Sequence, residues 1–179
     1  MIEYIKADIT TPNTDPSRYV AILNPMYLQG CAETKLQQQI FQEFPIAFWT
    51  PSSVPYRTGV IKHSNLLPRN YGMDIINAYL FDKDQRKSGL VDAAESALML
   101  ASVSVFKAAA NSICNIAFQQ SHYRSMTVRI PEYFGFAENE FPYNNWDEIR
   151  DTACRIFNDC NIRVEIWQHR RGKAPVVLD

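Results

Sequence analysis

The stretch YVAILNPMYLQGCAETKLQQQIFQEF, residues 19–44, constrains the fold more than any other part of this sequence. It contains a continuous apolar run, Val20–Leu23, which is typical of a central strand buried on both faces. A loop with one glycine follows, and then residues 33–44 predict a helix, because apolar residues recur at four-residue spacing from Leu36. In open α/β sheets, ligands bind where such a strand faces the next helix N-terminus. We therefore expect residues 24–33 to form one wall of any small-molecule site.

The rest of the chain alternates between strand and helix patterns. Further strands are predicted at residues 2–7, 59–63, 74–81, 126–130 and 162–167. Further helices are predicted at residues 92–112 and 146–158. The first and last strands alternate apolar and polar residues, which favours positions at the sheet edges. Strands that alternate with helices predict a layered α/β domain with a mostly parallel sheet.

The length, the amino-acid composition and the net charge are those of a folded protein. A chain of 179 residues is most simply one domain, which we expect to span residues 1–179. A hydrophobic content of 46% excludes intrinsic disorder, and a net charge of −1 disfavours nucleic-acid binding. The only basic cluster, Arg170, Arg171 and Lys173, is interpreted as part of a flexible, solvated tail over residues 169–179.

The cysteines and the apolar runs bear on compartment and cofactors. The four cysteines form no CxxC pair, and the three histidines lie far from them in sequence, so we expect reduced thiols and no metal site or cofactor. No signal peptide is visible, and no run approaches the ~18 apolar residues of a membrane span. We therefore expect a protein of the cytoplasm.

Three stretches together carry a family resemblance. Residues 5–10, IKADIT, look like a strand that ends in GDIT, and residues 20–45 combine a strand, a loop and a helix ending in Phe-Pro. Residues 128–131, VRIP, precede Gly135 and then a helix that opens with Trp146. In this order they resemble the macrodomain family of ADP-ribose-binding and ADP-ribose-processing modules, of the Appr-1″-p processing type. The resemblance covers nearly the whole chain and implies a three-layer α/β/α sandwich with a mixed, mostly parallel sheet of six or seven strands.

The resemblance also implies how a ligand would be held. Asp8 would accept the adenine amino group and Ile9 would add a backbone contact, although Asp8 could instead satisfy backbone donors of its own turn. Trp167 stands where the family often has an aromatic ring that stacks on adenine, although it could instead anchor the core. Gly30 and Cys31 belong to the first phosphate loop.

The first phosphate loop departs from the family pattern. The family commonly has a G-A-G-like run here, whose bare backbone N–H groups close around a diphosphate. Residues 32–35 of this chain read AETK instead. Glu33 would repel a diphosphate, and Lys35 would offset that repulsion without restoring the backbone cradle.

The second loop departs in a different way. It has only Gly135 where the family has several glycines, and that glycine is flanked by Tyr133, Phe134 and Phe136. The three rings would either line a ligand cleft or fill a groove that has lost its glycines, and we favour filling.

Catalytic groups are sparse. Asn24 is the only first-loop candidate, and it could instead cap the turn before Pro25. No acid–base pair and no nucleophile–base arrangement stands out. Hydrolysis of ADP-ribosyl or ADP-ribose 1″-phosphate substrates is therefore a hypothesis with little support from the residues.

The resemblance thus implies recognition of ADP-ribose or a related nucleotide diphosphate, as a metabolite or on an ADP-ribosylated protein. The competing interpretation is a degenerate macrodomain scaffold with a filled cleft that acts through protein–protein contacts. RNA binding through the cleft and the basic tail is a third and weaker alternative. Divergence of this degree would suit a viral or phage protein, which would act in the host cytoplasm.

Overall fold

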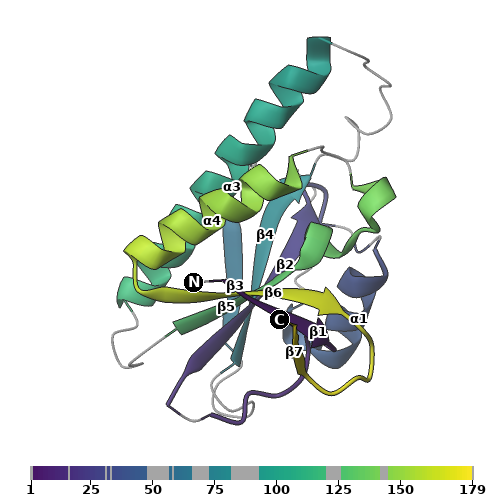
Figure 1. Ribbon diagram of the computed structural model, residues 1–179, viewed down its shortest axis with the longest axis vertical. Helices are drawn as coiled ribbons and strands as arrows, with labels where there is room; N and C mark the ends of the chain where they lie inside the picture. Colours follow the sequence, from purple (N-terminus) through teal and green to yellow (C-terminus); the bar gives the residue numbers. More distant parts are fainter. Residues whose placement is uncertain are drawn as a thin grey trace.

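One sheet of seven strands organises the molecule (Figure 1). The computed structural model describes residues 2–15, 17–30, 32, 34–47, 57, 59–65, 73–81, 93–119, 126–141 and 145–178. The strands are β1 (Ile2–Ala7), β2 (Tyr19–Tyr27), β3 (Ile61–Asn65), β4 (Met73–Phe81), β5 (Met126–Pro131), β6 (Ile162–His169) and β7 (Val176–Leu178). Their order across the sheet is β3-β4-β2-β5-β6-β1-β7.

The sheet is mixed and mostly parallel, as the sequence predicted. Strands β4, β2, β5, β6 and β1 run parallel to one another, and the edge strands β3 and β7 are antiparallel to them. The prediction that β1 and β6 lie at the edges is wrong, because each pairs with a strand on both sides. Their polar residues are accommodated by cross-strand ion pairs, Glu3 with Arg163 and Arg129 with Glu165. Alternating polarity therefore did not mark an edge here.

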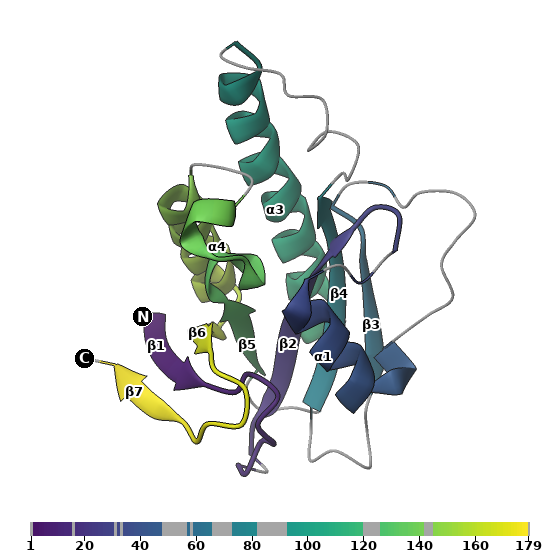
Figure 2. The same ribbon diagram turned by 90° about the vertical axis from the view of Figure 1, so that its right-hand side faces the viewer.

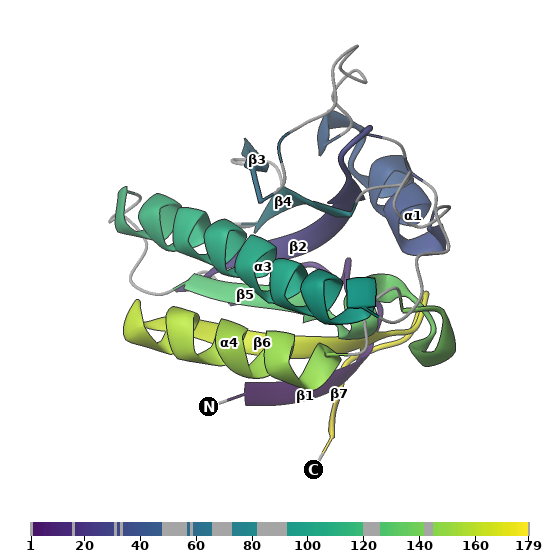
Figure 3. The same cartoon turned by 90° about the horizontal axis from the view of Figure 1, so that it is seen from above.

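Helices cover both faces and complete three layers. The helices are α1 (Lys35–Glu43), α3 (Ala93–Gln119) and α4 (Trp146–Asp159), and the 3-10 turns are η1 (Pro45–Ala47), η2 (Glu132–Gly135) and η3 (Glu138–Glu140). Helices α3 and α4 lie side by side over one face (Figure 3), where Phe106 and Phe157 enter the larger core cluster. Helix α1 covers the other face (Figure 2), where Ile40 packs on Ile22 and its neighbours. The predicted three-layer α/β/α sandwich is confirmed.

A capping box determines where α1 begins. The Thr34 hydroxyl accepts a hydrogen bond from the Gln37 N–H, and the Gln37 side-chain oxygen accepts one from the Thr34 N–H, both at 3.1 Å. The Gln37 amide group also donates to the Pro25 carbonyl at 2.6 Å, which ties the helix to β2. The first turn of α1, with Lys35 and Leu36, is thereby held above the carboxyl end of the central strands.

The C-terminal segment is part of the sheet. Val176–Leu178 form β7, which pairs antiparallel with residues 4–6 of β1, where the sequence predicted a flexible tail. Before β7, the Arg170 N–H donates to the Ala7 carbonyl at 2.7 Å and the Asp8 N–H donates to the Lys173 carbonyl at 3.1 Å. A strand of three residues is too short to leave a periodic pattern in the sequence. Among the described helices, α3 included, none combines the length and apolarity needed to cross a membrane.

Candidate functional site

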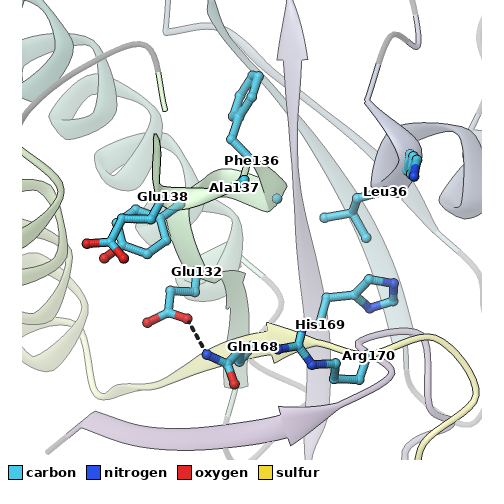
Figure 4. A pocket seen from close by; sticks show the side chains of 11 residues that line it. Leu36, Glu132, Phe136, Ala137, Glu138, Gln168, His169 and Arg170 are labelled. Atoms are coloured by element: carbon cyan, nitrogen blue, oxygen red, sulfur yellow. Dashed lines mark hydrogen bonds between the residues drawn. The ribbon is translucent and has the colours of Figure 1, made fainter. Parts of the chain in front are cut away.

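A cavity of about 350 Å³ opens at the carboxyl edge of the parallel strands. It lies between the first turn of α1, the loop after β5 and the end of β6 (Figure 4). Its walls are formed by Lys35, Leu36, Glu132, Tyr133, Gly135, Phe136, Ala137, Glu138, Gln168, His169 and Arg170. This is the edge at which open α/β sheets bind ligands.

Charge is divided between the two sides of the cavity. Glu132 and Glu138 lie on one side, and His169 and Arg170 lie on the other (Figure 4). Glu132 accepts a hydrogen bond from the Gln168 amide group at 3.2 Å. On the other side, neither Lys35 nor Arg170 has an ion-pair partner within the described part of the chain. Among the described residues, the cavity therefore presents two cations without ion-pair partners opposite two carboxylates.

Tyr133 adds a phenol to the acidic side. Its hydroxyl lies near the carboxylate of Glu138. Burial raises the pKa of Tyr133, and the charges of Glu138, Glu132 and Asp147 raise it further. The phenol is therefore a neutral donor at physiological pH.

The turn η2 has an unusual backbone. Tyr133 and Phe134 have φ of 51° and 52°, and Gly135 follows with φ of 85°. Positive φ is unfavourable for a bulky side chain and typically costs about 1–3 kcal/mol per residue. Phe134, which is 3% exposed, holds the turn through edge contacts with the rings of Trp146 and Phe81 at centroid distances of 5.2 and 5.8 Å. Phe134 thus fills the core, whereas Tyr133, Gly135 and Phe136 line the cavity.

Helix α1 contacts the turn η2 at Gly135. A Cβ added to Gly135 would lie 2.7 Å from Cδ2 and 3.2 Å from Cβ of Leu36. Leu36 in α1 therefore packs directly on the backbone of η2. A side chain at position 135 would clash with Leu36, so this close approach requires glycine. The contact also narrows the cavity between α1 and η2.

The Asp8 carboxylate is satisfied within the protein. It accepts hydrogen bonds from the Thr10 N–H at 3.0 Å, the Thr10 hydroxyl at 2.6 Å, the Gly172 N–H at 2.7 Å and the Gln39 amide group at 3.2 Å. Burial opposes ionisation of Asp8, but the bonds from Gly172 and Thr10 outweigh it and lower the pKa. Asp8 does not line the cavity.

The backbone of Ile9 is also occupied. Its N–H donates to Nδ1 of His169 at 3.2 Å, so the proton of the neutral imidazole is on Nε2. That Nε2–H donates to the Gln39 side-chain oxygen at 2.8 Å. Burial lowers the pKa of His169, although the Asp8 charge opposes the shift. The neutral His169 side chain therefore occupies the Ile9 N–H, which was expected to contact a ligand.

Trp167 is a core residue in this structure. It is 2% exposed, and the guanidinium of Arg129 stacks on its ring at 4.4 Å from the centroid. Arg129 also donates to the Ile9 and Thr11 carbonyls at 2.9 and 2.6 Å. Burial lowers the pKa of Arg129 to about 10, which leaves it charged at neutral pH.

Asn24 lies away from the cavity. Strand β2 continues to Tyr27, so the expectation that Asn24 ends the strand is wrong. Asn24 has no exposed surface, and its amide group donates to the Asn77 side-chain oxygen at 2.9 Å. Asn77 in turn donates to the Ala47 carbonyl at 2.9 Å. The pair joins β2 and β4 beneath the α1 layer.

The remaining predicted residues belong to the first loop. Gly30 is buried with φ of 74°, its N–H donates to the Tyr27 carbonyl at 2.9 Å, and it does not line the cavity. Cys31 and Glu33 lie outside the described residues. The cavity residues that sequence reasoning did not assign include Gln168, His169 and Arg170. Their position directly after a predicted strand was the available signal.

Comparisons with known proteins place the fold. No protein-family model matches this sequence, and no curated protein sequence does. Among solved structures, the macrodomain of DarG from Thermus aquaticus matches with a TM-score of 0.59 and 12% identity, over 94% of this chain and 98% of that one. The macrodomain of Mycobacterium tuberculosis DarG has a TM-score of 0.60 and 14% identity, over 93% and 97%. A macrodomain protein from Streptomyces coelicolor has a TM-score of 0.62 and 11% identity, over 95% and 100%.

This chain has the macrodomain fold. At such low identity the likeness concerns the backbone, so the chemistry of the site must come from its own residues. Within this macrodomain fold, the cavity lies at the edge where the resemblance implied a ligand cleft, and Tyr133, Gly135 and Phe136 line it. Asp8, Ile9 and Trp167 are instead bonded or packed within the protein. Among the described residues, no three His, Cys, Asp or Glu side chains gather as a metal site would require.

Proposed function

We propose that this protein binds ADP-ribose or a related nucleotide diphosphate in the cavity between α1 and η2. The observation that carries the proposal is the pair Lys35 and Arg170, which reach the cavity from two elements and lack ion-pair partners among the described residues. Cations without counter-ions in a partly enclosed site favour a phosphate-bearing ligand. The macrodomain fold, whose family binds such ligands, supports the same class.

The proposal is for binding and does not extend to turnover. A hydrolase of this kind needs a side chain that positions water beside the ribose. Asn24, the residue expected to do so, has no exposed surface and is bonded to Asn77 beneath α1. None of the described residues of the cavity forms a nucleophile–base pair in its place.

A calorimetric titration with ADP-ribose tests the proposal. We expect a Kd in the micromolar range, worth about 8 kcal/mol, together with a rise in Tm. Arg170→Glu places a like charge beside the phosphates and should abolish the heat. Arg155→Glu is the matched control, because Arg155 is an exposed cation on α4 that does not line the cavity. No heat and no thermal shift at ~1 mM ADP-ribose would refute ligand binding.

The second candidate function is a scaffold that acts through protein–protein contacts. The observation that favours it is the contact between Leu36 and Gly135, which narrows the cavity between α1 and η2. The titration separates the two candidates, because a scaffold predicts no ADP-ribose binding in either the wild type or the control variant.

A further inference from the structure

The groups that would contact an adenine base, the Asp8 carboxylate and the Ile9 N–H, are already hydrogen-bonded within the protein. Both oxygens of the Asp8 carboxylate accept hydrogen bonds, and one of these comes from the Gly172 N–H at 2.7 Å. The Ile9 N–H is bonded to His169. An adenine amino group would therefore have to displace several internal bonds to reach Asp8. Breaking buried hydrogen bonds without replacing all of them is unfavourable.

The segment that follows β6 is bonded to the end of β1 and keeps these groups in place. The Arg170 N–H bonds to the Ala7 carbonyl, and the Asp8 N–H bonds to the Lys173 carbonyl. Gln39 in α1 links His169 to Asp8, accepting from the imidazole and donating to the carboxylate. The end of β1, helix α1 and the segment after β6 are thus joined by hydrogen bonds around the Asp8 carboxylate.

The open part of the cleft has the chemistry of a phosphorylated sugar site. Its volume of about 350 Å³ is near the lower end of the ~300–1,000 Å³ common for ligand pockets. Lys35 and Arg170 offer charge-assisted donors to a phosphate. Glu132 and Glu138, on the acidic side, are acceptors with lone pairs to spare for sugar hydroxyls, since a carboxylate offers about four acceptor sites.

We propose that the cavity recognises the ribose-phosphate part of its ligand and does not read the base. Lys35 and Arg170 hold the phosphate, and Glu132 and Glu138 accept hydrogen bonds from the sugar hydroxyls. This inference rests on the proposed function and narrows it. The same chemistry is present in a free sugar phosphate and in the ribose-phosphate end of a nucleotide diphosphate.

Four ligands titrated into the wild-type protein test this proposal: ADP-ribose, UDP-ribose, ribose 5-phosphate and adenosine. We expect the Kd values of ADP-ribose and UDP-ribose to agree within about threefold, and adenosine to give no heat at ~1 mM. Ribose 5-phosphate binding as tightly as ADP-ribose would identify a sugar phosphate as sufficient. Weaker but measurable ribose 5-phosphate binding would show that the second phosphate contributes as well.

Variants assign the phosphate contact. Lys35→Ala and Arg170→Ala should each raise the Kd of ADP-ribose and UDP-ribose by about tenfold, equally for the two ligands. Both side chains are exposed, so the variants should fold. Arg171→Ala is the control, because Arg171 is exposed and lies outside the cavity wall, and it should leave the Kd unchanged.

The outcomes separate this inference from the proposed function. ADP-ribose binding more than about tenfold tighter than UDP-ribose, or heat from adenosine, would overturn base-indifferent recognition and leave ADP-ribose binding intact. Binding of none of the four ligands would overturn both. Equal ADP-ribose and UDP-ribose binding that neither Lys35→Ala nor Arg170→Ala weakens would overturn the assignment of the phosphate to these two side chains.

Discussion

At the scale of the residue, His169 must be neutral to accept the hydrogen bond from the Ile9 N–H. Its Nδ1 must be unprotonated to accept from Ile9, and burial lowers its pKa below the ordinary value of 6.5. When folding lowers the pKa of a histidine, it stabilises the neutral ring. This contribution to the free energy of unfolding is present at pH values above the histidine pKa of the unfolded chain, and it is lost as the pH falls below that pKa. The charged groups that act on the ring are Asp8, Glu43, Arg170 and Arg171.

We therefore expect the free energy of unfolding to fall as the pH is lowered from about 7 to 5, in the region of the unfolded histidine pKa. His169→Gln removes the titrating group while keeping an acceptor and a donor, so its stability should vary less over that interval. Urea denaturation at several pH values measures both proteins. Parallel curves for the wild type and the variant would contradict the role of His169. The contribution of the Asp8 carboxylate to the free energy of unfolding is lost only at lower pH, below about 3.8, because folding lowers its pKa.

At the scale of the element, η2 shows how packing overrides local preference. Two aromatic residues and a glycine in succession adopt positive φ, which neither tyrosine nor phenylalanine favours. The turn persists because Phe134 is buried among the rings of Phe81, Phe106 and Trp146. The sequence showed that Gly135 would be flanked by rings, but which ring faces the cavity depended on partners from β4, α3 and α4.

Two glycines give a matched test of the contact between α1 and η2. Gly135→Ala should lower the free energy of unfolding by about 2–4 kcal/mol, because it combines unfavourable positive φ with a clash against Leu36. Gly172→Ala should cost only about 1–2 kcal/mol, since φ is also positive there but no atom lies within 4 Å of the added Cβ. Urea denaturation provides the values, and a double-mutant cycle with Leu36→Ala isolates the clash. Equal losses for the two glycine variants would argue against the contact between α1 and η2.

At the scale of the whole molecule, the C-terminal segment joins one edge of the sheet to the candidate site. Strand β7 covers β1, and the residues before it bond to Ala7 and Asp8. In Figure 1 this segment curves around the end of β1 and returns to the sheet. The edge of the sheet and the closed part of the cleft are therefore stabilised together.

Ending the chain at Pro175 should expose the edge of β1 and lower the Tm by a few degrees. Hydrogen exchange should show that amides of β1 lose protection more than amides of β2, which pairs with strands on both sides. A chain that lacks only Asp179 is the control, since β7 is retained. Unchanged protection in β1 after removal of residues 176–179 would show that β7 contributes little.

The sequence by itself determined the kinds of elements and their order. Apolar runs and helical spacing depend on neighbouring residues, so β1, β4, α1 and α4 were predicted close to their observed bounds, whereas β2 extends four residues further than its apolar run. From that order the layered sandwich and the edge of the sheet that carries the cavity could both be predicted. The three motif stretches also indicated the macrodomain fold, because their residues and their order along the chain can be read without tertiary contacts.

Only the tertiary structure decided what each site residue does. Asp8 and Ile9 looked like ligand contacts in sequence, but their partners, Gly172 and His169, lie about 160 positions away along the chain. Trp167 is buried against Arg129 from a neighbouring strand. A hydrogen bond or stacked ring between distant residues leaves no local pattern, because it arises only when the strands are aligned. The cavity, with its cations facing two carboxylates, is a product of that alignment.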